Sequence, residues 1–218
     1  MSELHRKYGR RNNRKYKNII INHIQNNLKE YIISSIIFFI GILLGIVFVN
    51  NLNDVQTSEI QTYITNSINT LKENNVKEIS VLKESLSSNI FLAVSLWLMG
   101  STIIGLLVVY LIVCFKGFCF GYTLSSIIYV LGTNKGILFF ISTMFLKNII
   151  VIPCTIALAV SGMNVYKSVM QDRRKENIKL EIIRHTFFSI FILILLVLPS
   201  FIEAYISQNI LDYCIKYI

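Results

Sequence analysis

Residues 31–49 read YIISSIIFFIGILLGIVFV, a run without a single charged side chain. A helix that crosses the hydrocarbon core of a bilayer needs about 20 predominantly apolar residues. The whole chain has the same bias, since 54% of its 218 residues are hydrophobic and only 15% are charged. A soluble domain usually carries about a quarter charged residues. The sequence therefore predicts an all-α protein that spans a membrane several times.

Four further apolar stretches are candidates for spans. Together they predict five transmembrane helices, at 31–49, 90–115, 117–133, 136–164 and 186–206. The first is expected to be an uncleaved anchor, because no small-residue cleavage site follows it. The chain would then consist of a basic tail at 1–30, a membrane domain at 31–206 and a short C-terminal tail at 207–218.

Basic residues are distributed unevenly between the predicted loops. Eight Lys and Arg residues lie in 1–30, one at Lys116 and six in 165–185, against five on the other side (Lys72, Lys77, Lys83, Lys135 and Lys216). Because cytoplasmic loops are enriched in basic residues, we expect the N-terminus and 165–185 in the cytoplasm. The loop at 50–89 and the C-terminus would be exoplasmic.

Two other interpretations are disfavoured, one by the distribution of charge and one by the lack of supporting motifs. A re-entrant hairpin at 117–146 would move the basic segment 165–185 outside, so five true crossings are favoured. The formal net charge of +9 could indicate nucleic-acid binding. No zinc-ligand spacing and no platform of aromatic and basic residues supports that function.

The fourth stretch contains MFLKNIIVIPC at 144–154, which places a lysine and a proline in an apolar helix. Counted from Gly136, Lys147 lies about 16 Å deep, near the membrane midplane. An ammonium group there is costly unless it faces protein or a watery cavity. Pro153 removes a helical hydrogen bond. Either Lys147, Asn148 and Pro153 form a polar site at a broken helix, or the lysine snorkels along a bent helix.

Glu203 is the only acidic residue within a predicted span. It lies near the outer end of the fifth span, with a depth gap to Lys147 of about 10 Å. An ion pair between the two side chains is therefore not expected.

The chain lacks recognisable catalytic or cofactor-binding patterns. No paired carboxylates, nucleophile motif, phosphate loop or H-E-x-x-H spacing is present. We expect neither catalysis nor a cofactor or metal. The cysteines form no C-x-x-C pair and are interpreted as apolar fillers (Cys114, Cys119, Cys154 and Cys214).

Two pairs of glycines have the G-x-x-x-G spacing, Gly41 with Gly45 and Gly117 with Gly121. This spacing lets the backbones of two membrane helices approach closely. The four glycines are therefore predicted to lie at helix-packing positions.

The loop at 50–89 has apolar residues at helical spacing, which predicts one or two amphipathic helices. Their apolar stripe has three candidate partners: the bilayer surface, the chain's own bundle or an exoplasmic protein. If a protein docks there, the contact positions are Ile60, Ile64, Ile68, Leu71, Ile79 and Leu86.

The runs FKGFCFGYTLSSIIYVLG at 115–132 and FLKNIIVIPCTIALAVSG at 145–162 resemble the stage II sporulation protein M family. Gly117 and Gly121 match the glycine-rich entry to the family's third span, and Pro153 matches a proline in its fourth. The number of spans, the basic tail and the loop after the first span also fit.

One departure from the family pattern concerns the fourth span. Many members have a His-Gly pair before the proline and a glutamate two residues ahead of it. This chain has Lys147, Asn148 and Val151 at those positions. The loss of the acidic group argues against any proton chemistry by analogy.

The resemblance implies a non-enzymatic anchor and scaffold in the plasma membrane, on the mother-cell side of the sporulation septum. Its partners would be the stage II sporulation proteins D and P, which degrade septal peptidoglycan during engulfment of the forespore. The alternative is a transporter or permease-like subunit with a midplane anion site at Lys147 and Pro153. No inverted repeat is evident, although a homo-oligomer could supply the second half.

Overall fold

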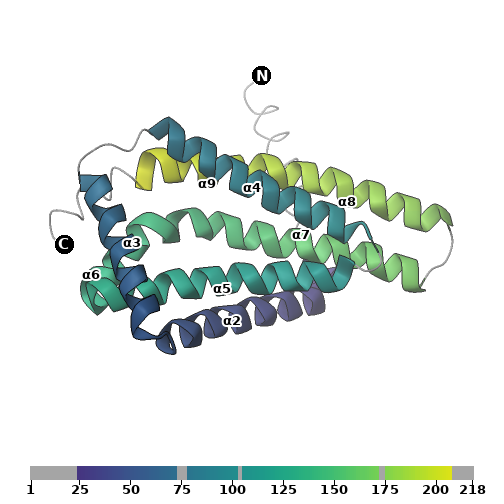
Figure 1. The fold of residues 1–218 in the computed structure, drawn as a ribbon. Coiled ribbons are helices and arrows are strands. Elements are labelled where there is room, and N and C mark those ends of the chain that lie inside the picture. The colour runs from purple at the N-terminus through teal and green to yellow at the C-terminus, as the bar shows by residue number, and fades with distance from the viewer. Residues whose placement is uncertain (1–23, 73–77, 103–104, 172–174, 208–218) are drawn as a thin grey trace, which may run out of the picture.

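The computed structural model describes residues 24–72, 78–102, 105–171 and 175–207. Within these ranges the chain forms helices and short connections, without strands, so the all-α prediction is confirmed. The elements are α2 (Leu28–Asn50), α3 (Asp54–Lys72), α4 (Glu78–Gly100), α5 (Gly105–Leu131), α6 (Thr133–Phe140), the π-helical η1 (Ile141–Phe145), α7 (Leu146–Gln171), α8 (Lys175–Leu195), α9 (Val197–Phe201) and the π-helical η2 (Ile202–Ser207) (Figure 1).

Five helical stretches are long and apolar enough to cross a membrane, as the sequence predicted. They are Leu28–Asn50, Glu78–Gly100, Gly105–Leu131, Thr133–Met170 and Ile178–Tyr205. The fourth joins α6, η1 and α7, and the fifth joins α8, α9 and η2. The chain is therefore a multi-pass membrane protein.

The predicted junction of the second and third spans at Lys116 is wrong. Helix α4 ends at Gly100 and α5 begins at Gly105, so Lys116 lies inside α5. The apolar run at 90–115 conceals a turn that hydroxyl groups stabilise. Ser101 Oγ donates to the carbonyl of Trp97 at 2.8 Å, and Thr102 Oγ1 donates to that of Met99 at 3.0 Å. Side-chain bonds of this kind satisfy the carbonyls at the end of a helix.

Two predicted loops are largely helical. Helix α7 continues to Gln171 and α8 begins at Lys175, so most of the basic loop predicted at 165–185 extends the fourth and fifth spans. The predicted loop at 50–89 contains one separate helix, α3. Its second amphipathic stretch forms the first turns of α4, from Glu78.

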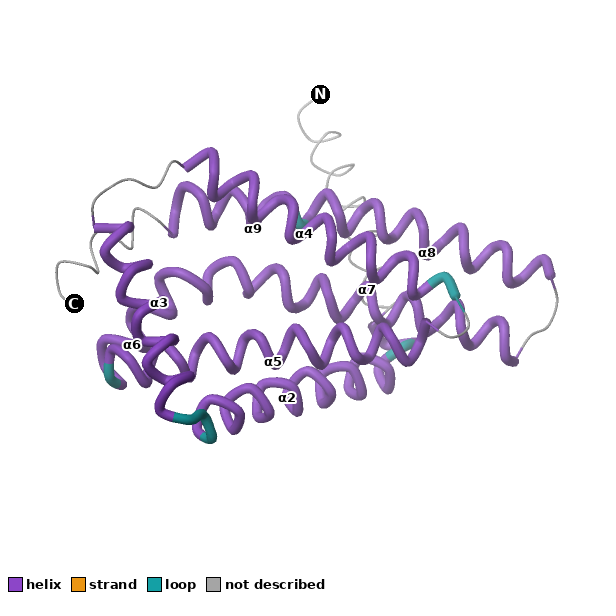
Figure 2. The backbone as a smooth tube through the Cα atoms, in the orientation of Figure 1, coloured by secondary structure: helices purple, strands orange, loops and turns teal. Residues whose placement is uncertain are grey.

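The spanning helices lie side by side, and α3 crosses them at one end of the bundle (Figures 1 and 2). Helix α6 and η2 lie at this end as well, which we call the α3 end. The turn between α4 and α5, the start of α2 and the end of α7 lie at the opposite end.

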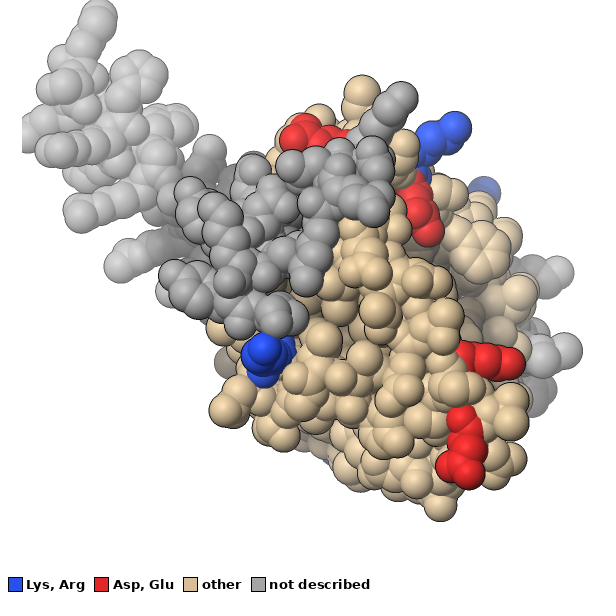
Figure 3. Space-filling view, turned by 60° about the vertical axis from the view of Figure 1, so that its left-hand side comes forward, with Lys and Arg blue, Asp and Glu red and all other residues tan. Residues whose placement is uncertain are grey.

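Large apolar side chains face outward along the bundle. On α2, Ser34, Phe38 and Gly41 are buried, whereas Phe39 and Leu43 are each 62% exposed. Figure 3 shows a broad uncharged surface with few acidic or basic residues. Outward apolar and inward small or polar side chains are expected of helices surrounded by lipid.

Glycines hold α2 and α5 in backbone contact. A Cβ added to Gly41 would lie 2.1 Å from the carbonyl oxygen of Cys114, and one on Gly117 would lie 2.2 Å from that of Phe38. Gly45 and Gly121 make the same approach one turn further along. Both predicted glycine pairs thus lie in one interface, facing each other.

Candidate functional site

An ion pair joins the fourth and fifth spans inside the bundle. Lys147, in the first turn of α7, pairs with Oε1 of Glu203 in η2, and the two side chains are 21% and 19% exposed. Ser85 Oγ, from α4, donates to Oε2 of the same carboxylate at 2.5 Å. Because charge-assisted bonds are strong and directional, Glu203 fixes three helical segments relative to one another.

This pair corrects the expectation that Lys147 and Glu203 lie too far apart. The depth estimate treated both spans as straight α-helices. In the structure each residue adjoins or belongs to a π-helical segment, η1 for Lys147 and η2 for Glu203, and these segments contact each other. The helical stretches that contain the two residues are 38 and 28 residues long, more than a bilayer core needs, so counting from an assumed span end does not fix their depth. π-Helical segments are frequent at functional sites.

A second polar contact lies one turn along α4 from Ser85. Asn89 is buried, and its Nδ2 donates to Ser200 Oγ at 3.0 Å and to the carbonyl of Leu196 at 3.3 Å. Leu196 joins α8 to α9, where Pro199 supplies no backbone donor. Ser85 and Asn89 therefore fasten α4 to the irregular end of the fifth span.

The predicted broken helix at Pro153 is wrong. Helix α7 continues through Pro153, which is exposed. The irregular segment is η1, which ends just before Lys147. Asn148 is buried and its Nδ2 donates to the carbonyl of Met144 at 2.8 Å. The polar site thus contains Lys147 and Asn148 but not Pro153.

A small cavity lies beside the ion pair. Its volume is 140 Å³, and we call it the lysine cavity because Lys116 and Lys147 both line it, with Cys119, Phe120, Thr123, Phe140, Met144 and Asn148. In the described part of the chain, Lys116 makes no hydrogen bond or ion pair. Two ammonium groups therefore accompany one bonded carboxylate, that of Glu203.

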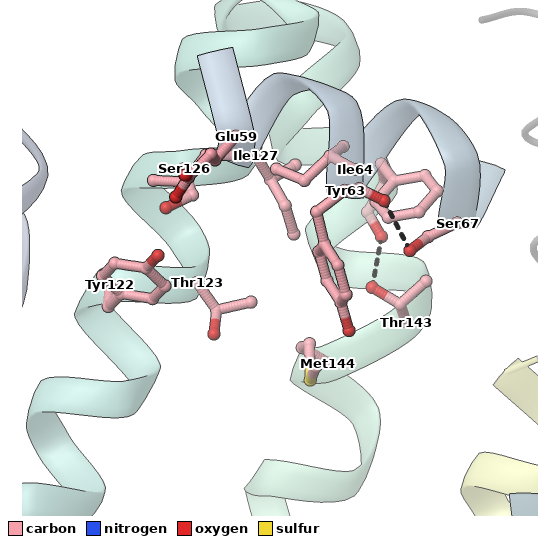
Figure 4. A pocket seen from close by; sticks show the side chains of 12 residues that line it. Glu59, Tyr63, Ile64, Ser67, Tyr122, Thr123, Ser126, Ile127, Thr143 and Met144 are labelled. Carbon is pink, nitrogen blue, oxygen red and sulfur yellow. Dashed lines mark hydrogen bonds between the residues drawn. The ribbon is translucent and has the colours of Figure 1, made fainter. Parts of the chain in front are cut away.

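A larger pocket of 480 Å³ lies between α3 and the α5, α6 and η1 segments (Figure 4). We call it the α3 pocket. Apolar and hydroxyl-bearing side chains line it, including Tyr63 from α3, Ser126 from α5 and Thr143 from η1. Ser126 is only 3% exposed, and its hydroxyl has no hydrogen-bond partner among the described residues. Thr123 and Met144 line both this pocket and the lysine cavity.

The predicted docking positions in the middle of α3 pack against the protein's own core. Ile64 and Ile68 are 8% and 6% exposed, and with half-buried Ile60 they pack against a cluster of Ile127, Phe139 and Phe140. Of the three candidate partners for this apolar stripe, the chain's own bundle is the one that covers it in the structure.

The remaining docking positions form no common surface with these. Ile79 is 74% exposed at the start of α4, and Leu86 is half-buried. The side chain of Leu71 lies outside the described residues.

The opposite end of the bundle has its own polar contacts. Glu30 of α2 pairs with Lys167 of α7, and Nδ1 of the buried His185 lies 2.9 Å from Ser161 Oγ. No three His, Cys, Asp or Glu side chains gather as a metal site would require, as far as the structure describes the chain.

Sequence reasoning missed Lys116, Ser85, Asn89 and Ser200. The sequence pattern predicts a loop at Lys116, and it places Ser85 and Asn89 before the second span. The four-residue spacing of Ser85 and Asn89, on one face of a helix that continues into an apolar run, was the available signal.

Comparison with known families gives one result. Residues 34–208 match the family described as stage II sporulation protein M. The chain belongs to this family. The matched region contains all five spans apart from the first turns of α2, as well as α3, Lys147 and Glu203. Membership confirms the resemblance in the sequence and identifies a multi-pass membrane protein of a sporulation family. Among curated proteins and solved structures, no significant match is found.

Proposed function

We propose that this chain is a non-enzymatic membrane scaffold that recruits peptidoglycan-degrading proteins to the sporulation septum and so supports engulfment of the forespore. Its partners would be the stage II sporulation proteins D and P, and its site the mother-cell membrane. The placement of α3 carries the proposal.

Helix α3 is a helix fixed across one end of the bundle rather than a loose connection. Ile64 and Ile68 attach its apolar face to the chain's own core, and burial of each such side chain stabilises by about 1.5–3 kcal/mol. The opposite face presents exposed Thr62, Asn66 and Asn69. A rigid polar surface of this kind suits protein docking because little ordering is needed on binding.

Charge supports an exoplasmic position for this surface. Lys29 of α2, Lys167 of α7 and Lys179 and Arg184 of α8 lie toward the opposite end of the bundle, which the positive-inside rule assigns to the cytoplasm. The α3 end would then face the septal wall. A scaffold there raises the local concentration of wall-degrading enzymes without taking part in their chemistry.

The test is co-purification of the two wall-degrading partners from sporulating cells that carry a tagged chain. Asn66→Arg combined with Asn69→Arg places two charges on the outward face of α3. Asn134→Arg, exposed on α6 at the same end, is the matched control. We expect the double variant to lose the partners and arrest engulfment, and the control to retain both. Normal recruitment by the double variant would exclude this face as the docking surface.

A further inference from the structure

The lysine cavity has more positive than negative charge. Lys147 is paired with Glu203, whereas Lys116 lines the same cavity without a hydrogen bond or ion pair to any described residue. Lys116 is the twelfth residue of α5, about 16 Å from the start of that helix and therefore near the middle of the membrane.

A second ammonium group in this position needs compensation. Charged side chains within a bilayer are costly and are normally paired or placed in a polar cavity where ligands bind. Coulomb attraction is strong in so apolar an environment, so an anion placed between Lys116 and Lys147 would be held by both. Asn148 and Thr123 add polar groups to the cavity wall.

The lysine cavity adjoins the α3 pocket. Thr123 and Met144 line both spaces, and Tyr122 and Ser126 extend the wall along α5 toward the α3 end. Figure 4 displays Thr123 and Met144 facing each other across the pocket, with Ser126 above them. The two adjoining spaces are thus polar and positive at the lysine end and largely apolar at the other, where the exposed Glu59 is the acidic residue of the lining.

We propose that this space binds an anionic amphiphile from the surrounding membrane, with its carboxylate or phosphate group between Lys116 and Lys147 and its apolar chain in the α3 pocket. The 140 Å³ cavity has about the volume of five water molecules, which suits a single small anionic group and not a large head group. The 480 Å³ pocket lies within the usual range for small-molecule sites. A free hydrated anion would have to pass these apolar walls.

The buried hydroxyl of Ser126 is a second, independent indication of a ligand. Buried polar groups without a partner are rare in folded proteins, and an unmet hydroxyl beside a pocket is explained by a group that binds there. A bound amphiphile with an ester or hydroxyl oxygen near its anionic group would give Ser126 a partner.

The experiment uses the full chain in nanodiscs of phosphatidylcholine, with dodecyl phosphate as the probe. Dodecanol supplies the same chain without the charge, and inorganic phosphate supplies the charge without the chain. The test variant is Lys116→Gln, which leaves the Lys147–Glu203 pair in place. Lys83→Gln, an exposed lysine of α4, is the matched control. Circular dichroism of each variant confirms that the helices are retained.

We expect dodecyl phosphate to bind the wild type at least about tenfold more tightly than dodecanol, and Lys116→Gln to abolish most of this difference. Lys83→Gln should bind as the wild type does. Equal binding of dodecyl phosphate by Lys116→Gln and the wild type would overturn the site. Displacement of dodecyl phosphate by millimolar inorganic phosphate would overturn the amphiphile, because a free anion would then be the ligand. Neither outcome bears on recruitment by α3.

Discussion

The α2–α5 interface and the charged cluster around Glu203 hold the same bundle together by opposite means. At α2–α5, four glycines let two backbones touch, and shape alone determines the fit. Around Glu203, one carboxylate joins side chains from α4 and α7, and the fit depends on bonds between residues far apart in the sequence. An added side-chain atom is therefore expected to destabilise the α2–α5 interface, whereas the loss of one bonded side chain is expected to destabilise the cluster around Glu203.

This difference assigns different roles to the two regions. A glycine interface has no group that changes charge or binds a ligand, so it is a structural part of the fold. The charged cluster contains π-helical segments, a cavity and a lysine beyond those needed for pairing. Features of this kind are costly and are retained mainly where a site requires them.

The largest expected effect comes from adding atoms to the glycine interface. Gly41→Val should lower the free energy of unfolding by about 3 kcal/mol or more, because its Cβ would meet the backbone of Cys114, which cannot move independently of α5. Unfolding of the solubilised protein by sodium dodecyl sulfate, followed by circular dichroism, measures the change. Val47→Leu, which enlarges an exposed side chain of the same helix, should have little effect. Equal stability of the two variants would mean that α2 and α5 are not in backbone contact.

The next largest effect is expected when the side-chain hydrogen-bond donor of Asn89 is removed. Asn89→Leu should lower the free energy of unfolding by about 2 kcal/mol, since Ser200 and the carbonyl of Leu196 lose their bond. The fluorescence of Trp97, the single tryptophan of the chain, follows unfolding in the same detergent titration. Ser88→Leu, exposed on the same turn, is the control. A loss no greater than that of the control would show that α4 is held to the fifth span by apolar packing alone.

The smallest effect distinguishes a ligand site from an ordinary packing defect. Ser34 and Ser126 are both buried with unmet hydroxyls among the described residues, and Ser126 lines the α3 pocket whereas Ser34 does not. In an uncharged detergent without dodecyl phosphate, Ser34→Ala and Ser126→Ala should each raise the free energy of unfolding by up to about 1 kcal/mol. Adding dodecyl phosphate should stabilise the wild type more than Ser126→Ala and should not distinguish Ser34→Ala from the wild type. Thermal unfolding measures both, and identical shifts for the three proteins would remove Ser126 from the ligand site.

The glycine interface could be predicted from the sequence, whereas the charged cluster around Glu203 could not. Five spans and the two glycine pairs follow from composition and four-residue spacing, which are local properties of a helix. The position of the α4–α5 turn could not be predicted from composition, because Ser101 and Thr102 end a helix inside a long, predominantly apolar run. The Lys147–Glu203 pair cannot be predicted in this way either, because it depends on how α7 and η1 pack against η2 and not on residue number along either helix.

The stripe on α3 illustrates a further limit. Its spacing predicts that Ile60, Ile64 and Ile68 share one face, which is a property of the helix. Which surface covers that face depends on the tertiary arrangement of α5 and α6, and the structure places it against Ile127 and Phe139. The same pattern would suit a partner protein equally well.

The most direct test of the account measures whether Lys147 and Glu203 stabilise the bundle as a pair. The free energy of unfolding is measured for the wild type, Lys147→Met, Glu203→Met and the double variant. A lone buried charge is costly, so each single variant should be less stable than the double variant, with a coupling free energy of about 1–3 kcal/mol. If the two single losses simply add to give the double, within about 0.3 kcal/mol, the residues do not interact and the charged cluster described here does not exist.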